Sequence, residues 1–147
     1  MVYAYVCRVI DGRGRYLLLQ RTGQVMHGVW QPVTGRVEAG EAGWQTALRE
    51  TVEETGLRPD RFYSANHVEL FYEPRWECIA VAPVFVALMD ANNEPQVTLS
   101  EEHGAFAWCD VETACERLLF PQQCATIRYI ERTFIQSEPV AYLKIET

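Results

Sequence analysis

Basic residues are scarce in this chain of 147 residues, which carries 13 Lys and Arg against 20 Asp and Glu. The resulting net charge of −7 is unfavourable for binding DNA or RNA, because such binding relies on lysine and arginine to displace counterions. No stretch approaches the roughly 18 uninterrupted apolar residues of a membrane span. The first residues, MVYAYVCR, lack the basic region and the cleavage site of a signal peptide. We therefore expect no signal peptide, and neither a nucleic-acid polymer nor a membrane as partner.

Cysteine is also sparse, and its spacing contains no C-x-x-C pair. The five cysteines are Cys7, Cys78, Cys109, Cys115 and Cys124. An odd number without paired spacing argues against a disulfide framework and against a zinc knuckle. We therefore expect a protein of the reducing cytoplasm, whose cysteines are small buried apolar side chains.

Apolar residues are plentiful, and they make up 48% of the chain. This fraction is enough for a packed core, and the length fits one domain over residues 1–147. Aromatic residues reach 12%, a composition that excludes an intrinsically disordered chain. The sequence contains neither an internal repeat nor a low-complexity linker.

Hydrophobic periodicity predicts strands on both sides of a helix. Residues 2–10 are apolar on both faces and indicate a central strand, and Asp11-Gly12 predicts a hairpin turn into a second strand at 16–21. We expect further strands near 33 and at 66–72, 77–89 and 105–109, a turn at 90–93, and helices at 42–55, 110–119 and 121–136. Pro83 predicts a bulge or an edge position, and residues 140–145 could pair as an edge strand with this sheet or a second chain. This order predicts an α/β sandwich with a mixed sheet.

Three glutamates share one face of the helix predicted at 42–55. Glu50, Glu53 and Glu54 occupy positions i, i+3 and i+4, on the side away from the apolar stripe. Like charges at this spacing destabilise a helix, so we expect something to compensate them. Divalent cations such as Mg²⁺ prefer oxygen ligands and combine one or two carboxylates with substrate phosphates. The array therefore predicts a cation site.

These three glutamates belong to a set of seven residues at fixed spacing. They are Gly35, Glu41, Arg49, Glu50, Glu53, Glu54 and Gly56. At typical residue frequencies, the joint chance of this arrangement is about one in 10⁸. The segment resembles the Nudix box G-x5-E-x7-R-E-U-x-E-E-x-G-U, in which U is aliphatic. Thr51, at the first U position, is the one departure, and it falls on the buried stripe.

The resemblance to Nudix hydrolases implies an α/β/α sandwich that binds Mg²⁺, with Mn²⁺ as an alternative ion, and hydrolyses a nucleoside diphosphate linked to another group. The metal ligands that it implies are the Gly35 carbonyl, Glu50, Glu53 and Glu54. Glu53 is either a ligand or the base that activates water. Arg49 would hold the glutamates in place, through Glu41.

Two segments outside the box bear on the substrate. Residues 29–35, VWQPVTG, resemble the F-W-Q-S-V-T-G segment of bacterial dATP and dihydroneopterin triphosphate pyrophosphohydrolases. Residues 97–108, VTLSEEHGAFAW, resemble their T-E-H-x-A-Y-K-W-L segment, which implies Glu102 as a further metal ligand. We therefore expect cleavage of a nucleoside or pterin triphosphate between its α and β phosphates, which releases a monophosphate and pyrophosphate.

Two alternatives remain open at this stage. The first is an asymmetric diadenosine tetraphosphate hydrolase, because residues 97–108 also resemble the L-S-x-E-H-x-A-Y-x-W segment of those enzymes. Some of them have R-E-T-x-E-E in the box, and Thr51 occupies the same position in this sequence. The products would then be ATP and AMP. The usual P-K-G segment of those enzymes is less similar to VTG at 33–35. The other alternative is a Nudix module that senses a nucleotide without hydrolysing it, although such modules usually lose box glutamates.

Several single residues complete the set of candidates. Arg8 and Arg21 could bind phosphate oxygens, because a guanidinium fork fits them. Trp30 could stack on a base or belong to the core. For His67 and His103 we expect structural hydrogen bonding rather than catalysis. The partner is then a small nucleotide or pterin triphosphate, and the protein is a monomer or a homodimer.

Overall fold

The computed structural model describes residues 1–90 and 94–147. Its strands are β1 (Val2–Ile10), β2 (Arg13–Arg21), β3 (Trp30–Gln31), β4 (Val33–Gly35), β5 (Arg61–Glu73), β6 (Cys78–Met89) and β7 (His103–Cys109). Its α-helices are α1 (Gly43–Thr55), α2 (Val111–Arg117) and α3 (Pro121–Ile130). A π-helical turn, Glu131–Ile135, continues α3, and a 3₁₀ turn, Ala141–Leu143, precedes the C-terminus.

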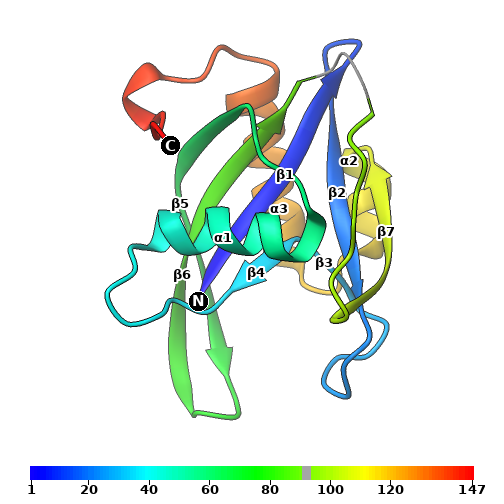
Figure 1. The fold of residues 1–147 in the computed structure, drawn as a ribbon, viewed down its shortest axis with the longest axis vertical. Helices are drawn as coiled ribbons and strands as arrows, with labels where there is room; N and C mark the ends of the chain where they lie inside the picture. Colours follow the sequence, from blue (N-terminus) through cyan, green and yellow to red (C-terminus); the bar gives the residue numbers. More distant parts are fainter. Residues whose placement is uncertain (91–93) are drawn as a thin grey trace.

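The strands form one mixed sheet. The order β3-β2-β1-β6-β5 runs across it, while β4 also pairs with β1 and β7 with β2. The pairing of β1 with β6 is parallel and all other pairings are antiparallel. Helix α1 lies across one face, and α2 and α3 lie behind the other (Figure 1). The predicted α/β sandwich with a mixed sheet is confirmed.

Each face of the sheet has its own core, because successive side chains of β1 alternate between the two. Val2, Ala4 and Val6 pack toward α1, together with Ala47 of that helix. On the other side, Tyr3, Tyr5 and Cys7 pack with Ala114 of α2 and with Ile127 and Ile130 of α3. Burial on both faces explains why β1 reads as a continuous apolar run.

Local sequence signals predicted the turn of the first hairpin and the end of α1. Asp11 and Gly12 have φ values of 52° and 73°, as a two-residue turn of type I′ requires. Gly56 has φ 72°, and its N–H donates to the carbonyl of Val52 at 2.8 Å. Thr51 is fully buried, and its hydroxyl donates to the carbonyl of Ala47 at 2.7 Å. The polar group at this box position is therefore satisfied within the helix.

The structure refines two predictions, and a third lies mostly outside the described residues. Pro83 is not in an edge strand, because β6 lies between β1 and β5. The expected irregularity is found beside it, since the register shifts between Ser64, which is opposite Phe85, and Val68, which is opposite Pro83. The C-terminal segment does not form a strand, but Lys144 makes a single bridge to Tyr63 on the edge of this sheet. The turn expected at 90–93 falls largely on residues 91–93, outside the described residues.

None of the described helices is long and apolar enough to span a membrane.

The cysteine prediction is wrong in one respect, because Cys115 of α2 and Cys124 of α3 form a disulfide. Their Cα atoms lie 4.9 Å apart, since the chain reverses between the two helices and packs them together. Cys7 and Cys109 are buried as expected, but Cys78 is exposed. The cysteine pattern therefore no longer supports a reducing compartment.

Candidate active site

The candidate site is formed where the end of β4 meets the carboxylate face of α1. Gly35 ends β4 opposite Val2 of β1, and α1 packs against both strands. A Cβ atom at Gly35 would lie 2.8 Å from Cδ and 2.9 Å from Oε1 of Glu50. Glycine is thus required here because the backbone of β4 and the Glu50 side chain occupy adjoining space.

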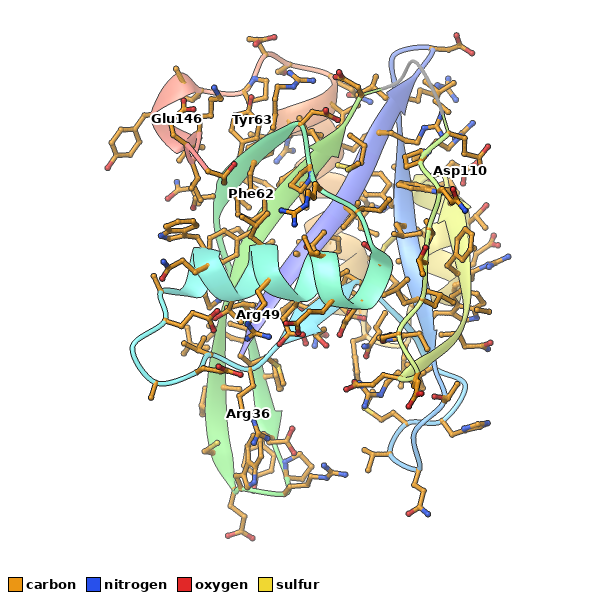
Figure 2. All side chains as sticks on the ribbon, viewed as in Figure 1. Arg36, Arg49, Phe62, Tyr63, Asp110 and Glu146 are labelled. Atoms are coloured by element: carbon orange, nitrogen blue, oxygen red, sulfur yellow. A yellow bond between two sulfur atoms is a disulfide. The ribbon has the colours of Figure 1, made fainter. Side chains whose placement is uncertain are left out.

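Arg49 connects the carboxylates, and Figure 2 shows it beneath α1. Its Nε and Nη2 atoms donate to the two oxygens of Glu41 at 3.0 and 3.1 Å. Its Nη1 atom donates to Oε1 of Glu50 at 2.9 Å and to Oε2 of Glu53 at 3.1 Å. A planar guanidinium can make these contacts together, whereas an ammonium cannot. Arg49 therefore fixes the loop before α1 and two of the three helix glutamates in one arrangement.

Glu41 is held as a carboxylate by its neighbours. Besides Arg49, it accepts from the hydroxyl of Thr46 at 2.7 Å and from the backbone N–H of Glu38 at 3.3 Å. Hydrogen bonds from Arg49, then from Thr46, lower the pKa of Glu41 to about 2. Thr46 was not among the sequence candidates, since nothing in its position five residues after Glu41 marks it as a partner.

Glu54 has the opposite environment. It is 6% exposed, and its Oε2 atom is buried without a hydrogen-bond partner among the described residues. Burial, reinforced by the charges of Glu50 and Glu102, raises the pKa of Glu54 to about 8. The pKa of Glu50 is also raised, chiefly by burial. Burial is the largest cause of both shifts, and the neighbouring carboxylates add to it.

Glu102 reaches this group through the segment that precedes β7. The N–H groups of Thr98 and Ser100 donate to the carbonyls of Thr55 and Glu54, at 2.8 and 3.3 Å. These bonds attach the segment to the last turn of α1. They account for the effect of the Glu102 charge on both Glu50 and Glu54.

The donor set fits a hard divalent cation. Carboxylate and backbone carbonyl oxygens are the ligands such ions prefer, and Glu54 offers a buried oxygen with no competing donor in the described part of the chain. Among these residues, however, no three acidic, histidine or cysteine side chains already converge on one point. Glu50 and Glu53 each direct one oxygen to Arg49. Each of these carboxylates therefore keeps a second oxygen for a cation while Arg49 holds the first.

The three substrate-binding candidates lie in different places. Arg21, at the end of β2, is close enough for its charge to lower the pKa of both Glu54 and His103. Arg8 is 7% exposed and packs against Trp108. It lies six residues along β1 from Val2, which pairs with Gly35, so Arg8 is about 20 Å along the strand from Gly35. The structure brings Arg21, but not Arg8, to the glutamates.

Trp30 belongs to the other side of the sheet. It packs partly buried in the core beneath α2 and α3, and Arg117 lies over its ring at 4.8 Å. Arg36, by contrast, lies in the loop after Gly35 and covers the ring of Trp76 at 5.2 Å (Figure 2). His103 is buried and lies 3.5 Å from the hydroxyl of Ser100, and burial lowers its pKa.

The chain is similar to known proteins over most of its length. The NUDIX domain family matches residues 1–130. The asymmetrical bis(5'-nucleosyl)-tetraphosphatase of Caenorhabditis elegans is 35% identical over 111 residues, which cover 74% of this chain and 77% of that protein. The crystal structure of a C. elegans Ap4A hydrolase binary complex superposes with a TM-score of 0.75 at 25% identity, over 89% of this chain and 93% of that one.

A longer protein is also similar. The octanoyltransferase of Myxococcus xanthus is 38% identical over 130 residues, which are 82% of this chain but 34% of that protein. The chain thus spans about a third of the length of that relative. The family match spans the glycine, the arginine and the glutamates described above. The chain belongs to the Nudix hydrolase family.

Proposed function

We propose that this protein hydrolyses a phosphoanhydride bond of a small nucleotide with the help of Mg²⁺, for which Mn²⁺ can substitute. Residues proposed to hold the ion are the Gly35 carbonyl, Glu50, Glu53, Glu54 and Glu102. The observation that carries the proposal is the buried Oε2 atom of Glu54, which has no partner within the described residues and stands among other carboxylates. A bound cation would neutralise this cluster and complete the Nudix site.

The chemistry requires charge neutralisation and an oriented water. When bound, divalent cations stabilise charge on the phosphate oxygens and lower the pKa of water. Glu53 is the carboxylate best placed to accept a proton, because its side chain is 58% exposed whereas Glu50 and Glu54 are largely covered. Arg21 is proposed to bind phosphate oxygens beside the glutamates, and Arg49 to position Glu50 and Glu53.

A dinucleoside tetraphosphate is the substrate we propose first. The 35% identical relative is an asymmetrical bis(5'-nucleosyl)-tetraphosphatase, and Thr51 matches the box variant of that group. The products would be a nucleoside triphosphate and a nucleoside monophosphate. The second candidate, a nucleoside or pterin triphosphate, is favoured by the VWQPVTG segment that leads to Gly35. Both substrates would be hydrolysed at the same carboxylates, and the residues that contact the base or pterin would decide between them.

One assay separates these candidates. Diadenosine tetraphosphate and dATP are each incubated with the protein and Mg²⁺, and the products are resolved by ion-exchange chromatography. ATP with AMP supports the first substrate, and dAMP with pyrophosphate supports the second. We expect Glu54→Gln to lower kcat at least 100-fold, while Glu116→Gln, at an exposed position of α2, leaves it unchanged. Absence of turnover with both nucleotides and either ion would refute these two substrates and favour a nucleotide-sensing module.

A further inference from the structure

An apolar surface on the hairpin of β5 and β6 is unexplained by the fold or by the candidate site. One end of this hairpin projects beyond α1 and β4 (Figure 1). Five of its side chains, all on one side, are 45–68% exposed: Val68, Leu70, Tyr72, Ile79 and Val81. We call these five residues the hairpin face. Exposed positions of a half-buried antiparallel strand are ordinarily polar, so a wholly apolar face is a departure from the usual pattern.

The strand register makes the hairpin face continuous. Its cross-strand pairs are Leu70–Val81 and Tyr72–Ile79, and Val68 lies opposite Pro83. Pro83 is on the same side of the sheet as α1, because its Cγ atom lies 3.6 Å from a Cβ position at Gly43. The opposite side of the same strands is packed, with Glu69 2% and Ala82 0% exposed. The hairpin is therefore buried on one side only.

The hairpin face stays largely uncovered by the described residues, since its five side chains remain 45–68% exposed although Arg36 of the loop after β4 lies over Trp76 at the border. Helix α1 begins at Gly43, beside Pro83, and runs away from the face. The C-terminal segment is attached at the other end of β5, where Ile145 N–H donates to the carbonyl of Phe62 at 2.8 Å. Figure 1 shows the C-terminus at the end of the molecule opposite the projecting hairpin.

The charge distribution and the area both suit a second copy of the chain. Each copy carries a net charge of −7, which opposes association through most of its surface, but the hairpin face contains no charged residue. At about 100 Å² for each exposed side chain, and with Trp76 at its border, the face presents about 600 Å². Two copies would then bury about 1,200 Å², the lower end of the range for stable dimers.

We propose that the hairpin face is the interface of a homodimer, in which the faces of two copies pack against each other about a twofold axis. Two pleated surfaces of Val, Leu, Ile and Tyr interdigitate as the inner faces of a β-sandwich do, about 10 Å apart. A twofold contact needs one self-complementary surface, and a flat apolar face meets that requirement. Trp76 extends the interface to Arg36, at the start of the candidate site.

Sedimentation equilibrium of the whole chain between 1 and 200 μM tests this proposal. The expected mass at the upper concentrations is twice the 16.9 kDa of the chain. Leu70→Glu and Ile79→Lys should each raise the dissociation constant at least 100-fold, because a charge would be buried without a partner. Both positions are exposed in the monomer, so far-UV circular dichroism should show that both variants remain folded.

Val140→Glu is the matched control, because Val140 is 60% exposed and lies outside the hairpin face. This variant should remain as dimeric as the parent protein. In addition, the Tm of the parent should rise with protein concentration, and that dependence should disappear in Leu70→Glu. A parent protein that is monomeric at 200 μM overturns the proposal. A Leu70→Glu variant that still dimerises also overturns it.

Discussion

Gly35 is a position at which one added methyl group tests the geometry of the candidate site. In Gly35→Ala the new Cβ would overlap the Glu50 side chain, with Cδ 2.8 Å and Oε1 2.9 Å away. Either Glu50 rotates or β4 moves away from α1. In both cases the carboxylate leaves its contact with Arg49, whose Nη1 atom is 2.9 Å from Oε1 of Glu50. We therefore expect effects on both stability and activity.

The size of each effect follows from the packing at Gly35. An extra methyl group in a filled space costs about 1–3 kcal/mol. The loss of backbone freedom in the unfolded chain returns about 0.4–1 kcal/mol of stability. The net destabilisation should be about 1–2 kcal/mol, which lowers Tm by about 3–6 °C in a protein of this size. Moving a catalytic group by about 1 Å costs about 100-fold, so kcat/KM should fall by about that factor.

Two other glycines supply matched controls. A Cβ at Gly23 would have its nearest neighbour 3.9 Å away, and one at Gly43 would make ordinary contacts at 3.6 Å. Neither has a positive φ, so Gly23→Ala and Gly43→Ala should be neutral or more stable by up to about 1 kcal/mol. Urea unfolding without divalent ions and kcat/KM with Mg²⁺ would be measured for all three variants. If Gly35→Ala has the same stability and the same kcat/KM as Gly23→Ala, then the β4 backbone and the Glu50 side chain do not occupy adjoining space.

Two further predictions concern stability. Burial raises the pKa of Glu69 above its ordinary 4.5, so the folded protein retains a proton that the unfolded chain loses, and stability falls as pH rises above that value. In Glu69→Gln, the free energy of unfolding from urea titrations should decrease less between pH 5 and pH 7.5 than in the parent protein. An equal decrease in both proteins would contradict a raised pKa of Glu69. The disulfide between Cys115 and Cys124 closes a loop with a sequence separation of 9, which predicts a contribution of about 2–3 kcal/mol. Reductant should destabilise the parent by this amount and leave Cys115→Ser unchanged; an unaffected parent would show that the bond does not contribute.

Local patterns in the sequence were sufficient for several features. Asp11-Gly12 predicted the hairpin turn because both residues tolerate positive φ, and both adopt it. The spacing of Glu50, Glu53 and Glu54 placed them on one face of a helix because helical geometry depends only on residue separation. Nudix membership followed from the box, since its seven residues lie between Gly35 and Gly56 of the chain.

Only the tertiary structure decided what lies beside those residues. Trp30 faces the α2 and α3 side of the sheet although it closely precedes Gly35 in sequence, and Arg8 lies far along β1 from Gly35. Cys115 and Cys124 meet because two helices pack together. A strand pattern fixes alternation but not which face is which, and contacts between elements depend on register and packing. The sequence by itself thus determined the family and the carboxylate array, whereas the folded chain determined which arginine reaches that array and which apolar face stays exposed.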